Sequence, residues 1–266
     1  MYTARYLGAE GFGVLSFALA FTGIFGVFTD LGLQQLTVRE VARDKSLAEK
    51  YLGNIAVMKL ILVTFTFRLI TLTINLLGYP EKTIKIVYLV ALSVISNAFT
   101  QMFYSIFQAF EKMEFVSIGR VLSSSLMLFG ALYAITLRFD VIGFALVYFL
   151  SNLIVLGYSF AVSVWKFVKP RIEIDWSFWG AIIREALPFG LTGAFIALYL
   201  WIDSVMLSFM IGDKVVGWYN AGYRLVLVLL SIPVAFNSAI FPVISRFYVT
   251  APDNVKFVFE NILNIC

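Results

Sequence analysis

The chain has 266 residues, of which 61% are hydrophobic and only 14% charged, and its formal net charge is +4. Soluble domains are about 45–50% apolar and about 25% charged, so the composition excludes an ordinary water-soluble globular protein. The chain has no His and a single Cys, which excludes Ser-His-Asp hydrolases, zinc hydrolases and, within one chain, a disulfide framework or a thiolate metal cluster. We therefore expect no metal site and no cofactor.

Seven apolar runs follow one another along the chain, each about as long as the 20 residues that cross a bilayer as a helix. The first is free of charge over residues 11–29 and continues past Asp30 to Val38. The other six cover residues 51–77, 86–110, 121–137, 141–165, 187–211 and 215–245. The sequence therefore predicts an all-α integral membrane protein with seven transmembrane helices. The short loops leave no room for a separate soluble catalytic domain, which argues against an enzyme.

One connecting segment, residues 171–185, has more pattern than the others. Apolar residues, among them Trp176 and Trp179, alternate in it with Glu173, Asp175, Arg184 and Glu185. This pattern predicts an interfacial amphipathic helix with its Trp residues at the headgroup level. The alternative is a plain connecting loop with anchoring aromatic residues.

The basic residues indicate orientation, because cytoplasmic loops keep the excess of Lys and Arg. One set of alternate loops carries twelve Lys and Arg residues and the opposite set carries five. We expect the richer set, around residues 39–50, 111–120, 166–186 and 246–256, to lie in the cytoplasm. The positive charge therefore reflects membrane topology, and we expect no nucleic-acid partner.

Polar residues recur at helical spacing inside five of the runs, which predicts a shared wet interior. For any single hydroxyl or amide, a hydrogen bond to a neighbouring helix is the simpler explanation. The five stripes are Thr64, Arg68, Thr71, Asn75; Ser93, Asn97, Gln101, Tyr104, Gln108; Tyr148, Asn152, Ser159; Thr192, Tyr199, Asp203; and Asn220, Arg224, Ser231, Ser238.

Charged residues inside the runs are costly in a bilayer and normally face a cavity or a partner. Lys59 lies nine positions before Arg68, on the opposite face of the helix, and we expect it to extend to the inner headgroups. Asp30 and Asp203 are the acids well inside runs. Each is a candidate for a structural ion pair with an in-span base or for titration with a coupling ion.

A short internal repeat links the two ends of the chain. Residues 7–13 (LGAEGFG) align with residues 211–217 (IGDKVVG) at a constant offset of 204. Six predicted spans fit in that interval, and an even number preserves orientation, so a true repeat would relate two parallel halves about an axis along the membrane normal.

Several runs of sequence carry a family resemblance. They are residues 5–13 (RYLGAEGFG), 16–21 (SFALAF), 30–33 (DLGL), 37–44 (TVREVARD), 216–225 (VGWYNAGYRL) and 241–248 (FPVISRFY). The chain resembles the polysaccharide transporter family, the Wzx-type flippases for lipid-linked oligosaccharides within the MATE-like MOP superfamily.

The resemblance implies a MATE-like bundle of 12 or 14 helices in two lobes, of which this chain would supply helices two to eight. Residues 1–165 would form an N-terminal lobe without its first helix, 166–186 a cytoplasmic linker, and 187–266 the start of a C-terminal lobe. We therefore expect a fragment of a longer transporter.

The function implied is a multi-pass flippase that moves lipid-linked oligosaccharide across the cytoplasmic membrane by alternating access. Its partners would be membrane lipid, a polyprenyl-diphosphate-linked oligosaccharide, a coupling ion (H⁺ or Na⁺) and polysaccharide-assembly proteins. The alternative is a MATE-like multidrug or cation exporter.

Two arginines are the leading candidates for substrate contact, because guanidinium is always charged and matches phosphate oxygens in a two-pronged geometry. We expect Arg68 and Arg224 to lie on facing lobes and to hold the diphosphate. Asn97, Gln101, Asn152 and Asn220 would then line the cavity beside the glycan.

Overall fold

The computed structural model describes residues 2–168, 174–226 and 229. The chain divides into two compact units, Met1–Trp218 and Tyr219–Cys266. In the second unit the described residues 219–226 are helical, and the rings of Tyr219 and Tyr223 stack with their centroids 5.6 Å apart.

The described residues of the first unit form helices joined by short turns, without strands. Seven α-helices are defined, with short 3-10 or π segments after α1, α2 and α6, and a further helical stretch begins at residue 213. Their bounds are α1 Tyr2–Gly26, α2 Leu33–Arg43, α3 Ala48–Leu76, α4 Glu81–Ala109, α5 Met113–Thr136, α6 Val141–Val162 and α7 Trp176–Met210.

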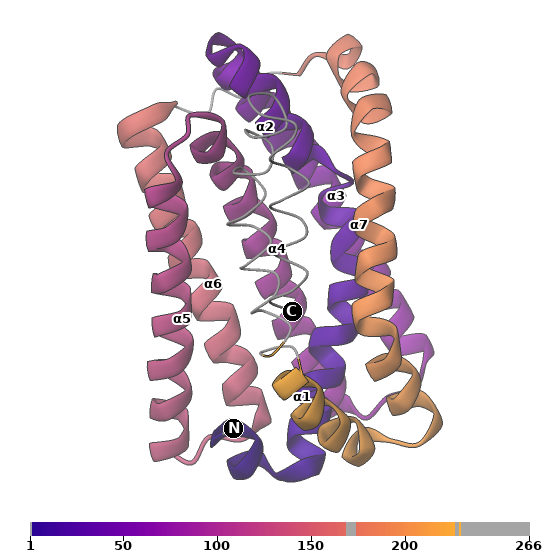
Figure 1. Cartoon of the computed structure of the whole chain (residues 1–266). Helices are drawn as coiled ribbons and strands as arrows, with labels where there is room; N and C mark the ends of the chain where they lie inside the picture. Colours follow the sequence, from indigo (N-terminus) through magenta and orange to yellow (C-terminus); the bar gives the residue numbers. More distant parts are fainter. Residues whose placement is uncertain (1, 169–173, 227–228, 230–266) are drawn as a thin grey trace, which may run out of the picture. The chain divides into compact units, whose positions relative to one another are not determined.

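Helix α4 is the central element of this unit and contacts α1, α2, α3, α5 and α6 (Figure 1). It passes through two separate apolar clusters. One includes Leu52, Met58 and Phe107, and the other includes Phe17, Ile74 and Val87. The clusters are separated along both α3 and α4, and this interruption contains the polar site described below.

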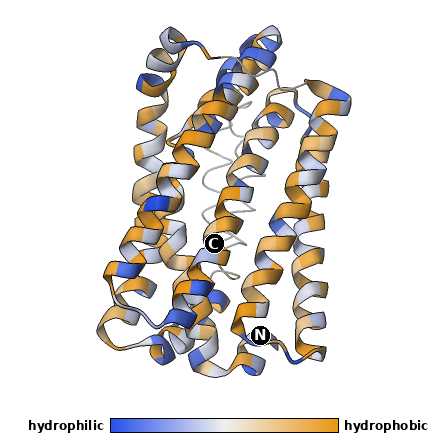
Figure 2. Ribbon diagram, turned by 180° about the vertical axis from the view of Figure 1, so that it is seen from behind, coloured by the Kyte–Doolittle hydropathy of each residue, from blue (hydrophilic) through white to orange (hydrophobic). Residues whose placement is uncertain are grey.

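Six helices of the described part are long and apolar enough to cross a membrane. Hydrophilic residues gather mainly toward the helix ends, whereas the middle sections are largely apolar (Figure 2). Large apolar side chains such as Phe65, Phe129 and Phe195 are exposed on α3, α5 and α7, which suits a lipid environment. The multi-pass, all-helical prediction is confirmed, while most of the predicted seventh span lies outside the described residues.

The first predicted span was too long at its end. Its helix ends at Gly26 and a 3-10 turn at Thr29, and α2 starts as a separate helix at Leu33. Leu31 and Gly32 between them have φ of 47° and 85°, a left-handed conformation that an α-helix cannot continue through. The predicted loop that begins at Arg39 accordingly starts inside α2.

Of the two interpretations of residues 171–185, the structure favours a helix for the part that it describes, and the position of this helix at the membrane interface stays a prediction. From Trp176 onward this segment is the first part of the membrane-crossing helix α7. Trp179 is only 8% exposed, and its indole Nε1–H donates to Oδ1 of Asn54 on α3 at 2.9 Å. Asp175 caps α7 by accepting from the N–H of Phe178, and its carboxylate lies 3.0 Å from the Lys50 ammonium. The segment is therefore fixed to α3.

The two segments of the internal repeat contact each other. A Cβ on Gly13 would overlap the backbone carbonyl of Asp213, and a Cβ on Gly217 would overlap that of Ala9. The offset of 204 relates Gly13 to Gly217 and also Ala9 to Asp213. The contact of Gly13 with Asp213 is therefore equivalent to the contact of Gly217 with Ala9, as for two copies of a segment related by a two-fold axis. Gly8 and Gly212, 204 apart as well, both have positive φ.

This close backbone approach predicts that Gly13→Ala and Gly217→Ala each destabilise the protein by about 1–3 kcal/mol through overpacking. Gly157→Ala on α6 is the matched control, because a Cβ there meets nothing within 4 Å and alanine favours helix. Thermal unfolding in detergent measures the difference. Equal melting temperatures for all three variants would contradict the assigned contact.

The cap at Asp175 predicts a pH dependence. The N–H of Phe178 and then the Lys50 ammonium lower the pKa of Asp175. The ionised carboxylate of Asp175 therefore stabilises the folded state fully above the ordinary carboxyl pKa of about 4. This contribution is lost as the pH falls through the lower pKa that Asp175 has in the folded protein. We expect the melting temperature of the unmodified protein to fall as the pH drops below about 4. In the Asp175→Asn variant, which has no carboxylate to protonate at this position, the fall should be smaller. Glu49→Gln, at an exposed carboxylate, should leave it unchanged.

Candidate functional site

A buried charge lies in the gap between the two apolar clusters. Lys59 on α3 is 1% exposed, and its Nζ lies 2.6 Å from Oδ1 of Asp30 and 3.4 Å from the carbonyl oxygen of Thr29. Asp30, between α1 and α2, is 28% exposed. The ammonium is therefore enclosed by protein, whereas the carboxylate also borders open space.

The break between α1 and α2 places this carboxylate. Because the chain turns at Leu31 and Gly32, α2 begins beside Asp30, and the N–H of Gln34 in its first turn donates to Oδ2 of Asp30 at 3.3 Å. One carboxylate oxygen thus binds Lys59 and the other binds α2. Together these bonds tie α1, α2 and α3 at a single point.

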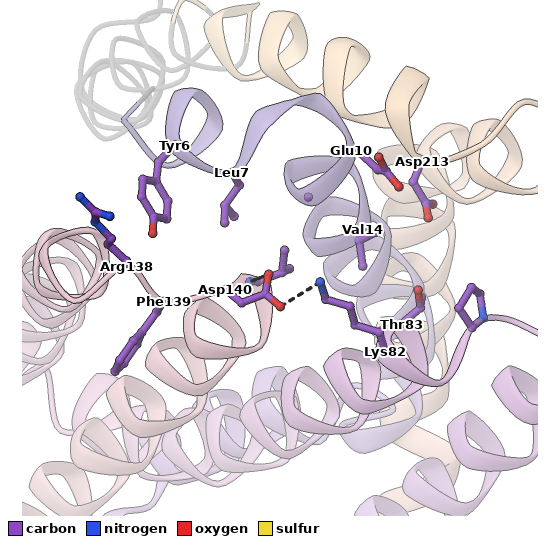
Figure 3. Close-up of a pocket in the computed structure, with 13 residues that line it drawn as sticks. Tyr6, Leu7, Glu10, Val14, Lys82, Thr83, Arg138, Phe139, Asp140 and Asp213 are labelled. Atoms are coloured by element: carbon purple, nitrogen blue, oxygen red, sulfur yellow. Dashed lines mark hydrogen bonds and ion pairs between the residues drawn. The ribbon is translucent and has the colours of Figure 1, made fainter.

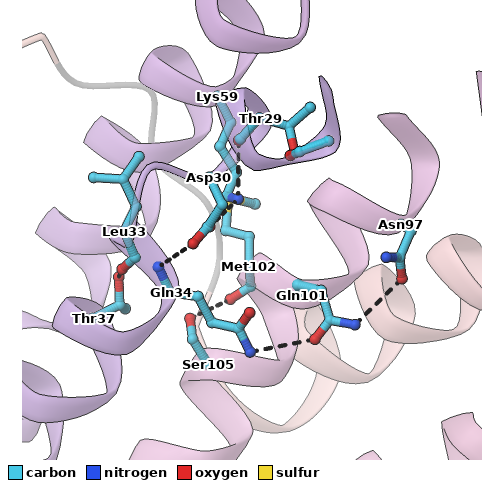
Figure 4. Close-up of polar contacts among 11 residues, drawn as sticks. Thr29, Asp30, Leu33, Gln34, Thr37, Lys59, Asn97, Gln101, Met102 and Ser105 are labelled. Carbon is cyan, nitrogen blue, oxygen red and sulfur yellow. Dashed lines mark hydrogen bonds and ion pairs between the residues drawn. The ribbon is translucent and has the colours of Figure 1, made fainter. Parts of the chain in front are cut away.

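An amide chain extends the cluster to α4 (Figure 4). Nε2 of Gln34 donates to Oε1 of Gln101 at 3.3 Å, and Nε2 of Gln101 donates to Oδ1 of Asn97 at 3.3 Å. Asn97 is exposed and Gln101 is half-buried. The result is a continuous polar line from a buried ion pair to an exposed amide.

Two cavities border this line. One, of about 290 Å³, is lined among others by Asp30, Lys59, Asn97 and Gln101. The other, of about 400 Å³, lies between the α1–α2 junction and α7 and is lined among others by Asp30 and Thr192. Both cavities share Asp30 and Gln34.

The chemistry of the cluster suits a hydroxyl-rich ligand. The ion pair is neutral as a unit, and the amides offer both donors and acceptors, as sugar hydroxyls require. No group of three or more His, Cys, Asp or Glu residues that could hold a metal ion is found among the described residues.

A larger hollow of about 710 Å³ lies near the opposite ends of the helices, where the α3–α4 and α5–α6 turns approach the start of α1 (Figure 3). The exposed ion pair of Lys82 and Asp140 at 2.8 Å borders it, together with Glu10, Arg138 and Asp213. Lys82 and the N–H of Val141 lower the pKa of Asp140. Lys82 and Asp140 in this hollow are exposed, in contrast to the buried ammonium of Lys59.

The comparison with known families decides the identity of this bundle. Residues 1–248 match the family described as "Polysaccharide biosynthesis protein". The chain belongs to this family. The family that the sequence motifs suggested is confirmed.

A curated relative of the chain is a Shigella flexneri protein named "Putative O-antigen transporter", which is 26% identical over 265 residues. The match takes in 92% of this chain and 61% of the relative, so the chain spans less than two thirds of that protein's length.

A solved structure of similar fold is an inward-facing multidrug resistance MATE family transporter of the MOP superfamily. Its TM-score is 0.68 at 19% identity, covering 99% of this chain and 67% of that one. The predicted MATE-like helical bundle is therefore confirmed for this family member.

Three of the predicted site residues are brought together. Asp30, Asn97 and Gln101 share the cavity beside the ion pair. Of the two roles considered for Asp30, the structure provides the ion pair. The in-span base is Lys59, so the prediction that Lys59 extends to the headgroups was wrong, because its ammonium is enclosed within the helix bundle.

The other predicted residues lie elsewhere. Arg68 is exposed on α3, and Asp203 is half-buried on α7. Asn152 on α6 is half-buried, and its Nδ2 donates to the carbonyl of Tyr148 at 2.9 Å. Arg224 and Asn220 belong to the second unit, so the facing arrangement of Arg68 and Arg224 stays a prediction.

Many polar groups in the predicted stripes are satisfied by their own helix. Thr64, Ser93 and Ser159 each donate to the carbonyl four residues earlier, as Thr192 does to Pro188. Helical spacing correctly placed these residues on one face, yet a side chain that bonds its own backbone needs neither water nor a neighbouring helix.

Sequence reasoning did not assign two members of the cluster, Lys59 and Gln34. The available signal was charge pairing: the first two predicted runs each contain an ionisable residue of opposite sign, Asp30 and Lys59. Gln34 carried no such signal, since its role depends on the turn that precedes α2.

The difference in burial predicts unequal effects of removing either charge. Asp30→Asn leaves a buried ammonium without its carboxylate and should cost about 3 kcal/mol. Lys59→Met leaves a partly exposed carboxylate and should cost less, and the double variant should be more stable than Asp30→Asn alone. Thermal unfolding in detergent measures all three.

The control is Lys82→Met, which breaks an exposed pair and should change stability by at most about 1 kcal/mol. A double variant less stable than both single variants would contradict a coupled buried pair.

Proposed function

We propose that the protein takes part in moving a lipid-linked oligosaccharide across the cytoplasmic membrane by alternating access, without covalent chemistry. The observation that carries the proposal is a polar, charge-balanced cavity inside a membrane-spanning bundle of the polysaccharide biosynthesis family. Such a cavity gives the hydroxyl groups of a glycan partners that lipid cannot supply.

In this proposal the lobes are residues 1–165 and 187–266, joined by the linker 166–186. The loops around residues 39–50, 111–120, 166–186 and 246–256 face the cytoplasm, following the excess of basic residues. Polysaccharide-assembly proteins would act before and after this step.

The glycan would contact Asn97 and Gln101, whose amides already border the cavity, and also Asn152 and Asn220. Arg68 and Arg224 would hold the diphosphate, since a guanidinium exposed on a membrane-spanning helix gains most from an anionic partner. Asp30 would serve as the structural partner of Lys59, and Asp203 would be the candidate for a coupling ion, H⁺ or Na⁺.

The test follows a labelled polyprenyl-diphosphate oligosaccharide across the bilayer of vesicles that contain the purified protein. Arg68→Ala and Arg224→Ala should each lower the rate at least tenfold, and Gln101→Ala should lower it less. Arg120→Ala is the control, because Arg120 is also an exposed arginine of a long helix but lies in the stretch assigned to a cytoplasmic loop, and it should transport normally.

Normal transport by both arginine variants would overturn the diphosphate assignment. Absence of transport by the unmodified protein, together with export of organic cations, would favour the alternative of a MATE-like multidrug or cation exporter.

A further inference from the structure

A cluster of phenylalanine rings lies where α4 and α6 end and α5 begins. The ring centroid of Phe167 is between 5.0 and 5.6 Å from those of Phe107, Phe110 and Phe115. Phe107 is fully buried, whereas the other three rings are partly exposed. Because two of the candidate membrane spans end here and a third begins here, we expect this Phe cluster at the level of the lipid headgroups.

The last turn of the α6 span, Ser163–Phe167, is a π-helix. Such turns are rare and are frequently found at functional sites. This one presents three successive residues in different surroundings. Trp165 is 80% exposed, Lys166 is exposed, and Phe167 packs into the Phe cluster. A cation thus lies between an apolar anchor and an exposed indole, a side chain that favours the membrane–water interface.

Two ammonium groups lie over the rings of this region. Nζ of Lys166 is 4.7 Å from the ring centroid of Phe115 and 5.1 Å from that of Trp165. Nζ of Lys45, at the start of the short turn before α3, is 5.7 Å from the ring centroid of Phe110. The ring faces hold the ammonium groups in place but offer no oxygen acceptor for their three N–H donors.

These two lysines also differ from their neighbours in charge pairing. Neither Lys45 nor Lys166 forms an ion pair with another residue that the structure describes. The ammonium of Lys112, by contrast, lies 3.8 Å from the carboxylate of Glu114. The Phe cluster therefore carries two positioned cations that can accept an anionic partner.

We propose that the Phe cluster, with Lys45 and Lys166, binds the headgroup of an anionic phospholipid. The phosphate oxygens accept from the two ammonium groups, and the glycerol and upper acyl carbons lie against the indole of Trp165. Basic pockets between membrane-spanning helices suit such headgroups, whereas the choline of a zwitterionic lipid would be repelled by the same cations. The bound lipid is a component of the membrane, so the inference does not rest on the proposed transport.

Native mass spectrometry of the purified protein compares binding of phosphatidylglycerol with binding of phosphatidylcholine. The unmodified protein should prefer phosphatidylglycerol. Lys45→Gln and Lys166→Gln should each weaken that binding about fivefold, the effect of one lysine near an anionic membrane surface. Lys166→Arg should retain it, because a guanidinium keeps the charge and also stacks on aromatic rings.

The matched control is Lys214→Gln, which should bind phosphatidylglycerol normally. Lys214 is also an exposed lysine over an indole, with its Nζ 5.2 Å from the ring centroid of Trp218. It follows Asp213, which borders the hollow at the opposite ends of the helices, so it lies far from the Phe cluster. Thermal unfolding in the same detergent checks that each variant is folded, and if one glutamine variant is not, the other decides.

Unchanged phosphatidylglycerol binding by the folded glutamine variants would overturn the proposal, and so would an equal loss in Lys214→Gln. Equal affinity of the unmodified protein for the two lipids would contradict recognition of the headgroup charge. Displacement of phosphatidylglycerol by an equal concentration of soluble glycerol phosphate would assign the cluster to a free phosphate instead, and displacement by a soluble acidic peptide would assign it to a protein partner.

Discussion

The buried ion pair of Lys59 and Asp30 is the constraint on which the arrangement of the first unit depends. A lysine ammonium enclosed in an apolar bundle is tolerable only with a carboxylate against it, and that carboxylate comes from a turn 29 residues earlier. The pair therefore requires α1 to end where it does and α2 to begin beside it. It also lies between the two apolar clusters, so the hydrocarbon core is interrupted by a cavity with polar lining.

The amphiphilic character of the site follows from this interruption. On one side of the α1–α2 turn the helices enclose amides and the ion pair, and on the other side they enclose only apolar side chains. Leu31 lies at the boundary in a left-handed backbone conformation. One short turn thus positions both the polar and the apolar surface.

The membrane-spanning helices could be predicted because a charge-free run of sufficient length has few alternatives in a bilayer. Helix α6, for example, starts at the predicted residue, Val141. Contacts between distant residues could not be predicted in the same way. The burial of Trp179 depends on Asn54, and that of Lys59 on Asp30, and neither partner is implied by local hydrophobicity. In the site, Asn97 and Gln101 were predictable from their spacing of four, whereas the role of Gln34 required the turn to be known.

The contact between Gly13 and Gly217 has a mechanical consequence. Because it joins bare backbone to bare backbone, no rotamers interlock across it. Interdigitated side chains hold two helices at one crossing angle, but two smooth surfaces can change their angle while staying in touch. Each glycine contacts a backbone carbonyl of the other segment. A change in the crossing angle would therefore shift both contacts by a similar amount. The internal repeat thereby provides a contact about which the two segments can pivot.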